Sequence, residues 1–249
     1  MQAAESLPTA EQIYGELMVA LDRAHFSLPV ERLQRNFPIG TATFVVGGFA
    51  RDCVRALIEG HSVKSKDLDL VIDTNGLANE LGKFNGRLSR TPLGGFHWIP
   101  VGASGWIDVW QLSDTVWIKK GHLRSTIENF LDGVDLNIDR IAIGLHDHTV
   151  IARECLSGVA RRYIDLDART KLKELELDEL ARAVVARLNT GYTLSEEVRS
   201  SLDHADLIAL LARSSERLAG DGYPTERIAQ VIEFISNRRA ALPATGTDN

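Results

Sequence analysis

The first third of the sequence contains a strand, a glycine turn, a helix and a second strand, and this pattern constrains the fold more than any other. Residues 43–46 (Thr-Phe-Val-Val) are apolar and largely β-branched, which predicts a short buried strand. Gly47 and Gly48 follow, and a glycine pair lets the backbone turn sharply and approach a ligand closely. The apolar spacing then predicts a helix over residues 49–60 and a second strand over residues 67–73.

Two aspartates on the second predicted strand point to a chemical function. Strand side chains alternate, so Asp67 and Asp69 project from one face, about 7 Å apart along the strand. A helix N-terminus with free backbone N–H groups receives phosphates. Paired carboxylates hold one or two Mg²⁺ ions, which bridge phosphate oxygens and activate a hydroxyl for in-line attack. A glycine pair alone is usually only a turn, and alternating aspartates are usually a solvated face, but their order here is far more specific.

That order resembles the head of the tRNA CCA-adding enzymes and bacterial poly(A) polymerases, within the DNA polymerase β-like nucleotidyltransferase superfamily. Residues 47–52 (Gly-Gly-Phe-Ala-Arg-Asp) match the family's GGxxRD motif, and residues 67–69 (Asp-Leu-Asp) match its metal-binding DxD motif. The resemblance implies that Asp67 and Asp69 are catalytic and bind the metal.

The same resemblance implies roles for the glycine motif. Gly47 and Gly48 are expected to cradle a nucleoside triphosphate, and Arg51 to contact a phosphate or a carboxylate. Arg51 and Asp52 are therefore candidate nucleotide-binding residues. A structural ion pair that holds the helix is an alternative of equal weight, because structural networks also gather charges.

A third candidate carboxylate lies on a later predicted strand. In residues 106–110 (Trp-Ile-Asp-Val-Trp), alternation places Asp108 on the same face as Trp106 and Trp110. If this strand lies beside the strand of Asp67 and Asp69, Asp108 is a third catalytic and metal-binding residue. The resemblance supports this, since the family places a third acidic residue on such a strand; the alternative is a solvated or hydrogen-bonded aspartate.

The family's RDFTxNAIA segment corresponds to residues 134–142, with departures. Asp135 is kept, and the resemblance makes it a candidate for ribose or structural contacts. The family's Arg is Val134 here, and its Asn is Asp139. Arg140 is a candidate substitute for the missing positive charge.

A helical pattern from residue 158 onward resembles the family's neck, so the likeness covers about residues 40–205. The family recognises the incoming base with an EDxxR motif, which aligns with residues 175–179 here. Its leading Glu is Leu175 and its Arg is Glu179, so the paired donor and acceptor set is missing.

Asp178 and Arg182 are a candidate substitute pair for this nucleotide-binding role. Such a pair would recognise one base but would not switch between two. We therefore expect a single-nucleotide or loose preference rather than ordered CCA addition.

Composition limits the class of protein. The 249 residues include 44% hydrophobic and 25% charged residues, which is typical of a soluble globular protein. No apolar run is long enough for a membrane span, no signal peptide is indicated, and two cysteines are too few for a disulfide scaffold or a zinc site. A cytoplasmic protein without a membrane partner is expected. The net charge of −6 counts mildly against an extended nucleic-acid footprint, although local basic patches matter more.

These patterns predict an α+β fold, and Pro29 and Pro38 are expected to lie in a connection before the first strand. The expected parts are an N-terminal helical segment (1–38), a nucleotidyltransferase head with a mixed β-sheet flanked by helices (39–157), an all-helical neck-like domain (158–242) and a disordered tail (243–249).

The resemblance implies Mg²⁺-dependent transfer of a nucleotidyl group from an NTP to an acceptor hydroxyl, at a tRNA-like RNA 3′ end, with two metal ions. Two alternatives stay open. One is a paralogue that binds a nucleotide or RNA without turnover, and the other is a nucleotidyltransferase with a protein acceptor. The sequence leaves the oligomeric state open.

Overall fold

A computed structural model describes residues 6–63, 67–81, 85–91, 94–101, 105–166, 177–220, 229–231 and 233–234. The chain forms two compact units. One contains Met1–Val134 and Ile138–Ala160, and the other contains Asp135–Asn137 and Arg161–Asn249. Within the described ranges, no helix has both the length and the apolar character needed to cross a bilayer.

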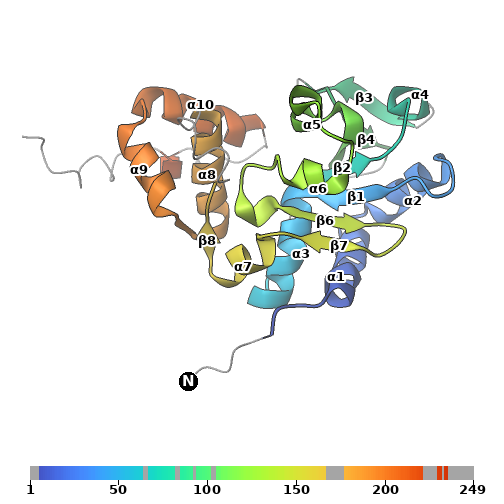
Figure 1. The fold of residues 1–249 in the computed structure, drawn as a ribbon, viewed down its shortest axis with the longest axis horizontal. Coiled ribbons are helices and arrows are strands. Elements are labelled where there is room, and N and C mark those ends of the chain that lie inside the picture. Colours follow the sequence, from blue (N-terminus) through green and yellow to red (C-terminus); the bar gives the residue numbers. More distant parts are fainter. Residues whose placement is uncertain are drawn as a thin grey trace, which may run out of the picture. The chain divides into compact units, whose positions relative to one another are not determined.

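The first unit is organised around a mixed sheet that is seven strands wide in the described residues (Figure 1). Its strands are β1 (Thr43–Val46), β2 (Asp67–Ile72), β3 (Gly86–Arg90), β4 (Phe96–Pro100), β5 (Trp106–Gln111), β6 (Ile141–Gly144) and β7 (Val150–Ala152). They lie in the order β3-β4-β5-β2-β1-β6-β7. Strands β2 and β5 run parallel, and the other neighbouring strands run antiparallel. The chain thus leaves β2, forms the β3–β4 hairpin at the edge, and returns through β5 to the side of β2.

Helices and short turns complete this unit. They are α1 (Ala10–Arg23), α2 (Ser27–Arg35), α3 (Gly47–Glu59), α4 (Leu77–Leu81), α5 (Val116–Gly121), α6 (Ile127–Leu131), α7 (Cys155–Ala160) and the 3-10 turns η1 (Leu112–Asp114) and η2 (Asn137–Asp139). Helix α1 packs against α3, and α3 contacts β1, β2 and β6 (Figure 1). Helix α3 therefore connects the glycine turn at its start to β2, the strand that carries Asp67 and Asp69.

Alternation along β1 and β2 gives the sheet two different faces. On one face, Phe44, Val46 and Val71 are buried in a cluster with Ile127 and Leu131 of α6. On this same face of β2, the positions two and four residues before Val71 are aspartates rather than apolar residues. The apolar cluster therefore covers one end of this face, and the other end carries the two carboxylates of β2.

The N-terminal region departs from the sequence prediction at one proline. Helix α1 confirms the predicted first helix, and Thr9 and Gln12 form a capping box at its start. Pro29, however, lies inside α2, so the expected connection at this proline is wrong. It occupies the first turn of the helix, where the backbone N–H has no intrahelical partner and its loss costs nothing.

The second unit is mainly helical. Its elements are α8 (Leu177–Thr190), α9 (Glu196–His204), α10 (Leu207–Gly220) and the strands β8 (Tyr163–Ile164) and β9 (Thr193–Leu194). Ser195 accepts a hydrogen bond from the Val198 N–H and caps α9. Strands β8 and β9 pair in a two-stranded parallel sheet, so the prediction of an entirely helical half is wrong in this detail.

The predicted α+β class is confirmed: a mixed sheet flanked by helices precedes a helical C-terminal part. The predicted tail at residues 243–249 lies outside the described residues. So does most of a last helix that the apolar spacing predicts over residues 225–241.

Candidate active site

The backbone of the glycine turn lies against the carboxylate of Asp69. Gly47 has a φ of +66°, and a Cβ atom there would lie 2.6 Å from Oδ2 of Asp69. Both the backbone conformation and the space therefore demand glycine at this position. At Gly48 a Cβ atom would lie 3.3 Å from Nη2 of Arg51, a tight contact with a flexible side chain. Helix α3 begins at this turn, and its N-cap residue, Val46, provides no side-chain cap. The first N–H groups of a helix have no intrahelical acceptor, and they suit a phosphate.

Three carboxylates lie on one face of the sheet. Strand β5 runs parallel to β2 with Asp108 as the register partner of Asp69 and with Trp106 opposite Asp67. Register partners project to the same side, and neighbouring strands are about 4.8 Å apart. The predicted condition for Asp108, a strand beside that of Asp67 and Asp69, is thus met. We call Asp67, Asp69 and Asp108 the acid row.

Asp108 is held by residues that the sequence analysis missed. Nδ1 of His97, on β4, lies 2.8 Å from Oδ1 of Asp108, and the Trp106 side chain also hydrogen-bonds this carboxylate. Burial raises the pKa of Asp108 from its ordinary value, and the hydrogen bonds from His97 and Trp106 oppose this shift. The charge of Asp67 adds to the increase. The alternation of β4 and β5 was visible in the sequence, but their register was not.

The acid row matches the chemistry of a Mg²⁺ site. Mg²⁺ prefers oxygen ligands and is usually bound by one or two carboxylates, with waters and substrate phosphates completing the shell. Asp69 and Asp108 supply such oxygens from adjacent positions. Among the residues that the structure describes, no three His, Cys, Asp or Glu side chains are arranged as a complete metal-binding group. Asp69 and Asp108 are candidate ligands, and Mg²⁺ remains a prediction.

Arg51 is engaged by two carboxylates. Its Nε lies 3.0 Å from Oδ1 of Asp52, and its Nη1 lies 2.7 Å from Oδ1 of Asp139. The Arg51 side chain is only 13% exposed. Burial alone would lower its pKa, but the charges of Asp52 and Asp139 outweigh burial and raise it. This is the arrangement of the structural alternative, and nucleotide contact by Arg51 or Asp52 remains a prediction.

Arg140 also has structural partners. Its Nε donates to the Val134 carbonyl oxygen at 2.9 Å, and its Nη1 donates to Oε2 of Glu154 at 3.0 Å. The side chain is 7% exposed. These contacts hold the segment before β6 and do not support Arg140 as a replacement for the family's missing arginine.

In the second unit, the two residues of the expected substitute pair contact other partners. Nη1 of Arg182 lies 2.8 Å from Oδ2 of Asp135, and Nε of Arg213 lies 3.3 Å from Oδ1 of Asp178. Asp135 thus makes a structural contact to α8 within this unit. Of the residues aligned with the base-recognition motif, 175 and 176 lie outside the described residues.

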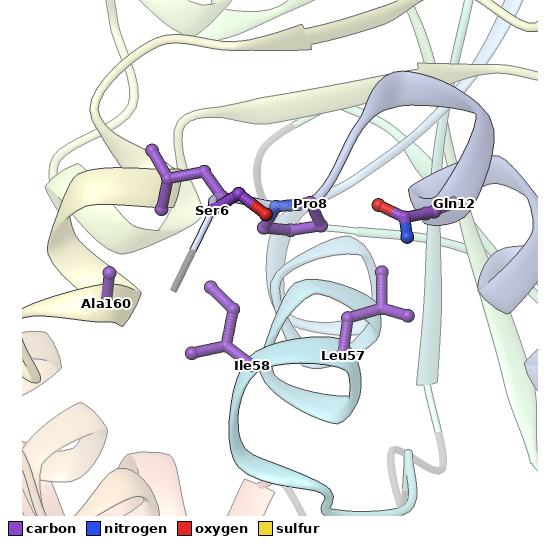
Figure 2. A pocket seen from close by; sticks show the side chains of 7 residues that line it. Ser6, Pro8, Gln12, Leu57, Ile58 and Ala160 are labelled. Atoms are coloured by element: carbon purple, nitrogen blue, oxygen red, sulfur yellow. The ribbon is translucent and has the colours of Figure 1, made fainter. Parts of the chain in front are cut away.

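A cavity of about 580 Å³ lies elsewhere in the first unit (Figure 2). It is lined by Ser6, Leu7, Pro8, Gln12, Leu57, Ile58 and Ala160. Leu57 and Ile58 belong to the last turn of α3, roughly 16 Å along the helix from the glycine turn. The cavity is therefore separate from the acid row.

The strand order and the flanking helices are those of a fold found in solved tRNA-processing enzymes. A CCA-adding enzyme with CTP has a TM-score of 0.58 and 17% identity, over 85% of this chain and 55% of that one. An apo tRNA-processing enzyme has a TM-score of 0.56 and 18% identity, over 96% and 58%. The Thermotoga maritima CCA-adding enzyme complexed with tRNA has a TM-score of 0.54 and 17% identity, over 83% and 54%.

These matches confirm the fold that the sequence resemblance predicted. The chain spans little more than half the length of the solved structures that it matches. No protein-family model matches the sequence, and no curated protein sequence is similar to it.

Proposed function

We propose that this protein is a Mg²⁺-dependent nucleotidyltransferase that moves a nucleotidyl group from an NTP to an acceptor hydroxyl, at the 3′ end of a tRNA-like RNA. The observation that carries the proposal is the β2–β5 register, which sets Asp108 beside Asp69 next to the turn at Gly47. The fold neighbours support the substrate classes, since their solved forms include complexes with CTP and with tRNA.

Each part of the site has a role in this reaction. The acceptor hydroxyl releases its proton to solvent as its oxygen bonds to the α-phosphorus of the NTP, and the bond from that phosphorus to the pyrophosphate leaving group breaks. The Gly47–Gly48 turn and the first N–H groups of α3 receive the phosphates, because a helix N-terminus favours negative charge. Asp67, Asp69 and Asp108 supply oxygen ligands, and Asp108, beside Asp69, also helps to activate the attacking hydroxyl. Bound Mg²⁺ would neutralise phosphate charge and lower the pKa of that hydroxyl.

A second candidate function is a paralogue that binds a nucleotide or RNA without turnover. The engaged state of Arg51 and Arg140 favours it, because both cations already have carboxylate partners in the protein. A nucleotidyltransferase with a protein acceptor uses the same acid row and differs only in what it modifies.

One experiment separates these functions. The protein is incubated with labelled NTPs, Mg²⁺ and total RNA, with and without a protein extract, and the label is followed. Label in RNA 3′ ends supports the proposal, label in protein supports the protein acceptor, and nucleotide binding without transfer supports the paralogue. Asp69→Asn tests the site, and Asp73→Asn, an exposed aspartate just after β2, is the matched control.

A further inference from the structure

The carboxylate of Asp108 is held from two directions. His97 lies directly opposite Asp108 in the β4–β5 register, and its Nδ1 is 2.8 Å from Oδ1 of Asp108. Trp106 lies two residues before Asp108 on the same face of β5, and its side chain hydrogen-bonds the same carboxylate. The His97 and Trp106 rings are 5.6 Å apart, so the two donors also contact each other. The side chain of Asp108 retains 20% exposure.

This arrangement restricts how the Asp108 side chain can rotate. A carboxylate accepts hydrogen bonds and does not donate them, so His97 donates from Nδ1 and the indole N–H of Trp106 donates as well. Each carboxylate oxygen has two lone pairs, and a bond from His97 to Oδ1 leaves acceptor capacity on both oxygens. When a metal-binding carboxylate accepts hydrogen bonds, the donors fix the orientation of that carboxylate. Loss of such donors typically weakens metal affinity.

The position of His97 in the sheet shows which side of Asp108 it occupies. Register partners form one row across four strands: Ser89 on β3, His97 on β4, Asp108 on β5 and Asp69 on β2. His97 is thus on the outer side of Asp108, and Asp69 is on the inner side. A donor on the outer side holds the carboxylate while its inner side stays available to whatever Asp69 binds.

We propose that His97, together with Trp106, is a positioning residue that orients Asp108 for a divalent cation shared with Asp69. The inference rests on the proposed function for the identity of the cation, but it concerns an orientation that can be measured without turnover.

The test uses the full chain with Mn²⁺ as a spectroscopic probe. Mn²⁺ binding is measured by electron paramagnetic resonance, alone and with CTP, and kcat and KM for CTP are measured in parallel. His97→Phe and His97→Leu replace the donor with an apolar side chain of similar or smaller size. His97→Asn keeps an N–H donor near the position of Nδ1. Ser89→Ala, one strand further out in the same row, is the matched control.

The expected result is a Mn²⁺ affinity weaker by about tenfold or more in His97→Phe or His97→Leu. His97→Asn should recover most of that loss, kcat should fall more than KM rises, and Ser89→Ala should match the wild type. A folded His97→Phe or His97→Leu protein with wild-type Mn²⁺ affinity overturns the inference. So does an equal loss in His97→Asn and His97→Leu, which indicates packing alone, and so does a wild type that binds no Mn²⁺ with or without CTP.

The proposed function fails separately. A wild type that binds Mn²⁺ in a His97-dependent manner but transfers no nucleotide supports the orientation of Asp108 and contradicts the transferase.

Discussion

Nη1 of Arg51 lies 2.7 Å from Oδ1 of Asp139, and this ion pair joins the first turns of α3 to the turn that precedes β6. Asp139 stands where the family's pattern has an asparagine. The extra negative charge at this position is matched by Arg51, which also contacts Asp52. The departure from the family pattern therefore has a local electrostatic explanation.

We predict a strong energetic coupling between these two residues. Arg51→Gln leaves Asp139 without its cation and leaves Asp52 with its longer pair to Arg55, at 3.6 Å. It should cost about 3–5 kcal/mol in the free energy of unfolding, the usual cost of breaking a largely buried pair. The double variant Arg51→Gln/Asp139→Asn should lose less than the sum of the single variants. Urea denaturation measures all three. Arg35→Gln, which breaks an exposed pair with Glu31, should change stability little, and additive losses at Arg51 and Asp139 would contradict the coupling.

The acid row gives a prediction about activity. Asp67→Ala and Asp69→Ala should each lower kcat by roughly 10²–10³-fold or more, because fixed charge at the reacting centre is a large part of such catalysis. Stability without ligand should stay level or rise, since clustered carboxylates repel one another. Mg²⁺ and NTP together should no longer raise the thermal unfolding temperature of either variant. Asp73→Ala should behave as the wild type, and a fully active Asp69→Ala protein would show that the assignment is wrong.

The glycine turn predicts different effects at its two positions. Gly47→Ala introduces a side chain at positive φ and 2.6 Å from Oδ2 of Asp69, so it should destabilise the fold by at least about 1–2 kcal/mol and displace Asp69. Gly48→Val should weaken CTP affinity more than it affects unfolding. Its side chain would stand at the start of α3, where phosphates are expected, and its Cβ would press on Nη2 of Arg51 at 3.3 Å. Calorimetric titration and urea denaturation measure the two quantities. Gly15→Ala in α1, where nothing lies within 4 Å, should be neutral or stabilising.

The environment of Asp108 predicts a pH-dependent stability. Its pKa is raised mainly by burial, so the folded state prefers the protonated form more than the unfolded state does. Any stability that this group contributes is present at acidic pH and is lost as pH rises through its folded pKa. Asp108→Asn, which is neutral at every pH, should therefore stabilise the ligand-free protein at pH 7, with a gain that shrinks as the pH falls toward the ordinary value of 3.8. Urea titrations across this range measure the difference. A gain in stability that grows as the pH falls would contradict a raised pKa for Asp108.

The second unit predicts what is added to the acceptor. Asp178 pairs with Arg213 and Arg182 pairs with Asp135, so the two residues of the expected substitute pair have other partners. We predict that transfer shows a single-nucleotide or loose preference and does not build an ordered C-C-A end. Sequencing the 3′ ends of tRNA that lacks CCA, after incubation with all four NTPs, measures this. Efficient addition of C-C-A that then terminates would refute it.

Local patterns allowed the sequence to predict β1, the glycine turn, α3 and β2, because alternation, helical spacing and glycine act over a few residues. Asp108 was predicted only conditionally, since β5 reaches β2 after the β3–β4 excursion and its register is a tertiary property. His97 was missed for the same reason. The Arg51–Asp139 pair spans 88 residues, and no local pattern reports it.

The chain leaves the acid row after β2, forms the β3–β4 hairpin and returns to the row at β5, so β2 and β5 pair directly although the hairpin separates them in sequence. Exchanges of residues within this hairpin leave Asp67 and Asp69 in the chain, since both lie on β2. They can replace the residue opposite Asp108, because His97 lies on β4. The hairpin is thus the part of the fold that supplies the side chain holding the third carboxylate, while the three carboxylates themselves lie on β2 and β5.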